Sequence, residues 1–85
     1  MRISTAPLFD RHFKKLPRLL QEKAKEREKL FIDNPFHPRL GTHKLHGKRG
    51  AEWAYSVDYS YRITFLFLSG GEVLYTDVGT HDELY

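Results

Sequence analysis

The 85-residue sequence contains no cysteine, and its longest strongly apolar run covers only residues 63–68. The lack of cysteine excludes disulfides, cysteine-based zinc sites and thiol nucleophiles. The apolar run is far shorter than the roughly 20 residues that a membrane-spanning helix needs. The first residues show no basic-then-apolar signal pattern. We therefore expect a cytoplasmic protein with no membrane partner, folded as a single domain over residues 1–85.

Basic side chains are almost missing from the second part of the sequence. Residues 50–85 contain Arg62 as their one basic residue, against six acids. Residues 1–49 hold 13 of the 14 Lys and Arg residues and five acids, which gives this part a net charge of +8. Such asymmetry is typical of a chain whose basic part binds a polyanion. Lysines also gather on the solvated faces of ordinary helices, so both interpretations stay open.

The first 34 residues predict a short strand followed by two helices. Residues 1–4 fit an edge strand, and Thr5 is placed to cap a helix with Pro7 in its first turn. Apolar residues at three- and four-residue spacing predict this helix and a longer one over residues 17–33. The second helix should end before Asn34-Pro35, because the residue before a proline disfavours helical backbone. Two helices joined by so short a break predict an antiparallel hairpin.

The remainder predicts a basic loop and three strands. Residues 35–50 contain two prolines, three glycines, three histidines and four basic side chains, with no regular period. Residues 52–58, 61–68 and 73–78 read as strands joined by short connections, which predicts an antiparallel meander. The expected fold class is therefore α+β: a short N-terminal strand and a two-helix hairpin packed on a mostly antiparallel sheet of about four strands.

Arg62 lies in the middle of the most apolar predicted strand. Its neighbours Tyr61 and Ile63 should face the helices, so the Arg62 side chain should lie on the uncovered face of the sheet. Two interpretations are about equally supported by the pattern. Arg62 either pairs with Asp58 or Asp77 on a neighbouring strand, or forms an anion site, since a planar and permanently charged guanidinium suits phosphate.

The C-terminal residues supply two further candidates. His81 follows the last predicted strand after Gly79, which we expect to let the chain turn off the sheet edge. A histidine at this rim is suited to exchange protons with an attacking or leaving oxygen. Tyr85 either stacks on a base or fills a gap in the core.

His43 and His46, in the basic loop, form a second pair of proton-transfer candidates. A spacing of three with no further ligand pattern is poor support for a metal site, so we expect no metal and no cofactor. A basic surface with an arginine floor and histidines at its edges has the groups that metal-free RNA cleavage needs. These are a base for the 2′-OH, a cation for the phosphate and an acid for the departing 5′-oxygen.

The chain contains, in order, a strand, a helical hairpin ending in D-N-P, then K-L-H-G, W-A-Y-S-V-D-Y-S-Y-R-I-T-F and D-V-G-T-H-D-E-L-Y. In this order these motifs resemble the RelE/ParE superfamily of bacterial and archaeal type II toxins over essentially the whole chain. The Y-R-I-x-F strand and the G-T-H-D-x-x-Y tail are most similar to the branch that contains RelE and YafQ. The resemblance implies a RelE-like fold and a ribosome-dependent endoribonuclease that cuts messenger RNA in the ribosomal A site. It also implies a cognate antitoxin as partner, with no DNA binding by the toxin alone.

The resemblance also implies roles for individual residues. Arg62 corresponds to a catalytic arginine that contacts phosphate, His81 to a catalytic histidine of the YafQ-like branch, and Tyr85 to a terminal aromatic near the scissile nucleotide. His46 falls where RelE-like chains have a basic residue, and we include it as a second proton carrier. The residues expected to bind RNA are His43, Lys44, Lys48 and Arg49.

The sequence departs from the family pattern at the general base. RelE has two lysines on the first long strand where this chain has Ala54 and Ser56, and the YafQ-type histidine of that strand has no clear counterpart. His43 or His46 could replace them. The ParE branch, which inhibits DNA gyrase, shares the fold but normally lacks the histidine tail, so gyrase inhibition or a toxin that acts by binding alone is the alternative function. A plain RNA-binding module is a third hypothesis.

Overall fold

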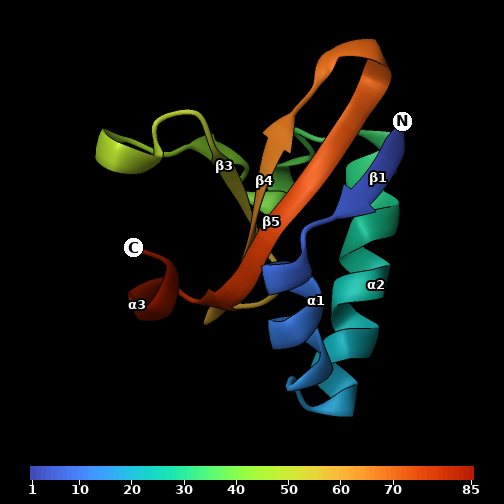
Figure 1. Ribbon diagram of the computed structural model, residues 1–85. Coiled ribbons are helices and arrows are strands. Elements are labelled where there is room, and N and C mark those ends of the chain that lie inside the picture. The colour runs from blue at the N-terminus through green and yellow to red at the C-terminus, as the bar shows by residue number, and fades with distance from the viewer.

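The computed structural model describes residues 1–85 and contains one five-stranded sheet (Figure 1). The strands lie in the order β1-β5-β4-β3-β2, with β1 parallel to β5 and all other neighbours antiparallel. Their bounds are β1 Arg2–Thr5, β2 His43–Lys44, β3 Trp53–Ser56, β4 Tyr61–Phe67 and β5 Glu72–Thr80. This confirms the expected α+β fold and its mostly antiparallel sheet. The fifth strand, β2, lies inside the segment that the sequence predicted to be a loop.

Two helices, α1 (Pro7–Lys14) and α2 (Arg18–Asp33), form the predicted hairpin beside one face of the sheet (Figure 1). Helix α2 ends where expected, since Asn34 before Pro35 has an extended backbone. The predicted cap of α1 was wrong. The capping residue is Ala6, whose methyl side chain cannot accept a hydrogen bond. Thr5 belongs instead to β1, whose pairing with β5 continues into the hydrogen bond from the Ala6 N–H to the Tyr75 carbonyl.

Aromatic side chains fill the space between helices and sheet. Phe31 of α2 is fully buried and stacks on Tyr55, with the ring centroids 4.7 Å apart, and meets the edge of Phe65 at 4.8 Å. The hydroxyl groups of Tyr55 and Tyr75 hydrogen-bond each other across 2.8 Å, so neither is left unpaired in the core. Burial of such rings supplies much of the stability of so small a domain.

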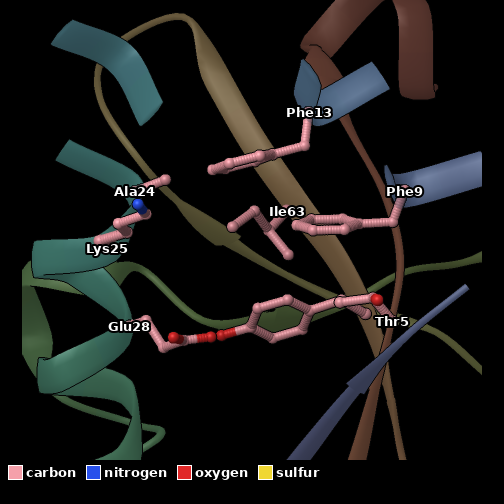
Figure 2. A pocket seen from close by; sticks show the side chains of 8 residues that line it. Thr5, Phe9, Phe13, Ala24, Lys25, Glu28 and Ile63 are labelled. Atoms are coloured by element: carbon pink, nitrogen blue, oxygen red, sulfur yellow. The ribbon is translucent and has the colours of Figure 1, made fainter. Parts of the chain in front are cut away.

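A cavity of about 150 Å³ remains between α1, α2 and the sheet (Figure 2). Phe9 and Phe13 of α1 and Ile63 of β4 form its apolar walls, and Glu28 of α2 reaches in from the other side. Burial raises the pKa of Tyr75, and the nearby hydroxyl of Tyr55 and the charge of Glu28 raise it further. The cavity therefore lies inside the helix-covered layer, with Lys25 of α2 as the one cationic residue that lines it.

A bulge interrupts the pairing of β4 with β5. Thr64 pairs with Asp77 and Phe65 with Tyr75, so Thr76 is an extra residue without a partner. The Thr76 hydroxyl lies 2.8 Å from the Thr64 hydroxyl and also donates to the carboxylate of Glu52. This irregularity places a polar cluster on the face of the sheet opposite the hairpin.

The segments outside the large elements are more ordered than expected. Short 3-10 helices cover Pro38–Leu40 (η1), Gly47–Arg49 (η2) and Ser69–Gly71 (η3), and a final helix α3 covers His81–Leu84. Strand β5 continues through Gly79, so the expected turn at this residue was wrong. Gly79 instead leaves room for α3, since a Cβ there would lie 3.1 Å from Oε1 of Glu83 and 3.4 Å from its Cβ. None of the helices is long and apolar enough to span a membrane.

Candidate active site

Helix α3 and the loop that carries η2 project from the sheet on the side away from the helical hairpin (Figure 1). Between them lies an open cavity of about 430 Å³. Seven of the eight residues that the sequence predicted for the site line it, and Arg62 is the exception. The lining residues are His43, Lys44, Leu45, His46, Lys48, Arg49, His81 and Tyr85.

Helix α3 positions His81 and Tyr85 together. Thr80 accepts a hydrogen bond from the backbone N–H of Glu83, whose carboxylate accepts one from the backbone N–H of Thr80. This capping box starts a helix at His81, so His81 and Tyr85 lie one turn apart. Their rings meet edge to face with centroids 4.4 Å apart. The His81 side chain is 66% exposed, so a ligand can reach it.

Strand β2 brings His43 to the same aromatic ring from another part of the chain. The His43 and Tyr85 rings are 6.4 Å apart, edge to face. Nδ1 of His43 lies 3.1 Å from the carbonyl oxygen of Gly41. A carbonyl only accepts hydrogen bonds, so Nδ1 carries the proton of the neutral ring and Nε2 keeps its lone pair. His46 makes no capping hydrogen bond at the start of η2. The structure thus distinguishes two histidines that the sequence left equivalent.

Arg49 is committed to contacts within the protein. Its Nε and Nη2 hold the Glu52 carboxylate at 2.8 and 3.2 Å, and Nη1 donates to the carbonyl oxygen of Leu84 at 2.5 Å. The hydrogen bond to Glu52 raises the pKa of Arg49. Burial acts to raise the pKa of Glu52, but the hydrogen bonds from Arg49 and Thr76 outweigh it and the pKa lies below its usual value. The sequence analysis predicted that Arg49 binds RNA, and the structure shows Arg49 in an ion pair with Glu52.

Arg62 has no carboxylate partner. Its Nη1 donates to the backbone carbonyls of Asp58, Tyr59 and Tyr61 at 2.8, 3.1 and 3.1 Å. Of the two acids proposed as ion-pair partners, Asp58 accepts the backbone N–H groups of its own turn, and Asp77 contacts a histidine of α1. The salt-bridge interpretation was therefore wrong, and the guanidinium keeps its net charge.

The charges of two arginines act on Tyr85: Arg49, which lines the cavity, and Arg62, which does not. Partial burial raises the pKa of the Tyr85 hydroxyl, and the positive charges of Arg62 and Arg49 lower it less than burial raises it. The hydroxyl is therefore protonated at neutral pH and can donate a hydrogen bond. The Tyr85 side chain is 46% exposed, which leaves part of the ring open to a ligand.

Solved structures with the same chain path are toxins. A YoeB/ParE toxin from Agrobacterium tumefaciens superposes with a TM-score of 0.79 at 14% identity, covering 95% of this chain and 99% of that one. YafQ from E. coli strain BL21(DE3) superposes with a TM-score of 0.76 at 20% identity, covering 100% and 99%. This chain has the RelE/ParE toxin fold. The YoeB–YefM complex from Staphylococcus aureus is similar as well, with a TM-score of 0.77 at 13% identity and coverage of 95% and 97%. Neither a protein-family model nor a curated protein sequence matches the chain.

The structure also joins His12 and Asp77, a pair that the sequence analysis did not connect. Nδ1 of His12 lies 2.6 Å from the Asp77 carboxylate, which also accepts the backbone N–H of Val78. The pair links α1 to β5 beside a third cavity, of about 210 Å³. Lys15 and Glu83 also line this cavity. His12 and Asp77 are 65 positions apart and no local pattern connects them, so only the parallel pairing of β1 with β5 would have placed them together.

No group of three or more His, Cys, Asp or Glu side chains could hold a metal ion. The polar side chains at the 430 Å³ cavity are instead three imidazoles, three cations and one phenol. Such groups can transfer protons and bind a phosphodiester.

Proposed function

We propose that the protein is the toxin of a type II toxin–antitoxin system and cuts messenger RNA in the ribosomal A site without a metal. The observation that carries this proposal is the meeting of His43, His81 and Tyr85 in one cationic cavity on a RelE/ParE toxin fold. Two histidines at one cavity allow one to take a proton while the other gives one, as cleavage of RNA through its own 2′-OH requires.

In the proposed reaction, Nε2 of His43 takes the proton of the 2′-OH. The 2′-oxygen attacks phosphorus, the bond from phosphorus to the 5′-oxygen breaks, and His81 gives a proton to that oxygen. The products are a 2′,3′-cyclic phosphate and a free 5′-OH, so atoms and protons balance. His43 is favoured as base over His46 because the Gly41 carbonyl fixes its tautomer and leaves Nε2 unprotonated.

Cations and an aromatic ring complete the proposed site. Arg62 and Lys44 stabilise the charge that develops on the phosphate oxygens, since fixed cations near developing charge lower the barrier. Lys48, which is exposed and lines the same cavity as Lys44, binds the RNA backbone. Tyr85 stacks against the nucleotide and donates its protonated hydroxyl to a phosphate or sugar oxygen.

The proposed partner in the resting state is an antitoxin encoded with the toxin. The net charge of +8 over residues 1–49 favours an acidic partner segment. The structurally similar YoeB was solved in complex with YefM, which supports an antitoxin protein as the partner of this chain. The proposed target of the toxin itself is the translating ribosome with its messenger RNA, in the cytoplasm.

The test is to replace His81 with alanine and to measure ribosome-dependent cleavage of messenger RNA. We expect a loss on the order of 10²- to 10⁴-fold, the usual contribution of a general acid or base. His81 is exposed and outside the core, so the variant should unfold at the same urea concentration as the wild type. Full cleavage by the variant would refute the mechanism.

Measurements of toxicity, DNA breaks and RNA binding on the wild-type protein separate the alternative functions. Toxicity with intact messenger RNA and accumulating DNA breaks would identify a gyrase inhibitor. Salt-dependent RNA binding without toxicity would identify a plain RNA-binding module.

A further inference from the structure

The Arg49 side chain joins three separate parts of the chain. It forms a two-nitrogen contact with Glu52 before β3, reaches the Thr64 hydroxyl of β4 at 3.4 Å, and donates to the Leu84 carbonyl at the end of α3. The Thr76 hydroxyl at the bulge of β5 donates to the same Glu52 carboxylate. One hydrogen-bonded chain therefore runs from β5 through Glu52 and Arg49 to the last helix.

We propose that Arg49 is a positioning residue: it clamps the end of α3 against the sheet and so holds Tyr85 against His43, and it does not bind RNA itself. The catalytic consequence rests on the function proposed above, whereas the clamp itself is a property of the isolated protein.

Helix α3 needs such a clamp because it is only four residues long. A helix of this length is not stable alone in water. Its start is fixed by the capping box at Thr80. Its end is fixed by the Leu84 side chain, which is 4% exposed, and by the bond from Arg49 to the Leu84 carbonyl.

The position of these anchors predicts which contact is lost first. Without the Arg49 bond the beginning of α3 is still capped, so His81 should keep its place. Tyr85 directly follows the released carbonyl and should move away from His43 on β2. We therefore expect loss of the contact between the His43 and Tyr85 rings, with the capping hydrogen bond of Glu83 retained.

The arrangement also requires arginine. Its planar group donates to Glu52 with one edge and to the Leu84 carbonyl with another nitrogen, which the single ammonium of lysine cannot do. Glu52 offsets the charge of Arg49. Arg49 should therefore contribute little to the attraction of RNA, unlike the exposed Lys48 next to it.

The experiment compares Arg49→Lys, Arg49→Gln and Lys48→Gln in the full-length protein. NMR spectra of the isolated proteins report the cross-peaks between the His43 and Tyr85 rings and the shifts of the Leu84 methyl groups. We expect both Arg49 variants to lose the cross-peaks and shift the methyl groups, and Lys48→Gln to keep the wild-type pattern. Glu52→Gln, which keeps the Arg49 side chain, should weaken the cross-peaks and thus tests the clamp even if an Arg49 variant folds poorly.

Cleavage kinetics then separate positioning from RNA binding. For Arg49→Lys we expect kcat to fall about 100-fold, as displacement of a reacting group by about 1 Å can cause, with KM unchanged. Arg49→Gln should leave the salt dependence of RNA binding unchanged, while Lys48→Gln should reduce its slope by about 0.7, the value for one phosphate contact on a single strand.

Two results would overturn the inference: wild-type ring cross-peaks in both Arg49 variants, or a reduced salt slope in Arg49→Gln equal to that of Lys48→Gln. If the wild-type protein cuts no messenger RNA, the proposed function fails, but the NMR comparison still decides whether Arg49 holds α3.

Discussion

Replacing His43 with glutamine should remove the general base while keeping the shape of β2. Glutamine is close to histidine in size and keeps a polar side chain, but its amide cannot take up a proton. A positioned base contributes on the order of 10²- to 10⁴-fold to a rate, which corresponds to about 3–5 kcal/mol of barrier. The structure supports the full effect, because the Gly41 carbonyl at 3.1 Å holds the ring in the tautomer with a basic Nε2.

His46→Gln is the matched control for this change. Both histidines are exposed, lie within four residues of the chain and line the same cavity. Only His43 contacts Tyr85 and has a fixed tautomer. We therefore expect His46→Gln to lower the rate of cleavage by less than about tenfold, through weaker RNA contact alone.

The assay is cleavage of a defined messenger on purified ribosomes under single-turnover conditions, with both variants compared with the wild type in the same buffer. If His46→Gln causes the larger loss, the assignment of the base is wrong. If both variants cut at the wild-type rate, the two-histidine mechanism is wrong.

Two further predictions concern the parts of the fold that support the site. Phe31→Ala, which empties a fully buried position stacked on Tyr55, should lower the free energy of unfolding in urea by about 3–5 kcal/mol; Phe36→Ala, at a ring that is 55% exposed, should cost less than half as much, and equal losses would contradict the core described above. Glu52→Gln should be less stable than the wild type at pH 7 by about 1–3 kcal/mol. Because the pKa of Glu52 is lowered by folding, its stabilising effect is complete above the usual carboxyl pKa and disappears as pH falls through the lowered value. The two unfolding free energies should therefore converge below about pH 4, and a constant difference would show that the Glu52 charge does not stabilise the fold.

Sequence patterns were sufficient to predict the helices and strands that bury an apolar face. The helix over Arg18–Asp33 and the strand over Tyr61–Phe67 both have strong periodicity and agree with the structure to within one residue at each end. Strand β2 has only two residues, His43 and Lys44. It carries no period of its own and exists because Ala54 and Trp53 on β3 pair with it.

Sequence patterns predicted most of the residues that line the 430 Å³ cavity, but not the contacts that each of them makes. Histidines, cations and a terminal aromatic pointed to the cavity that they line. Whether a cation is free or paired depends on contacts between distant parts of the chain. Arg49 is held at Leu84, 35 positions away, and Arg62 is held by the carbonyls of its own turn. The bulge at Thr76, which completes the Arg49 network, depends on the register of two strands, and the local sequence does not specify it.

The parallel pairing of the first strand with the last has a consequence for the timing of folding. Arg2 pairs with Glu72 and Thr5 with Tyr75, so β1 has no neighbour until almost the whole chain has been synthesised. Contacts this distant in sequence form late and slow the folding of small domains. The nascent chain can form its helical hairpin early, but β5 and α3, which complete the sheet and carry His81, emerge last. The cavity lined by His43, His81 and Tyr85 is therefore complete only after residues 72–85 have joined the sheet.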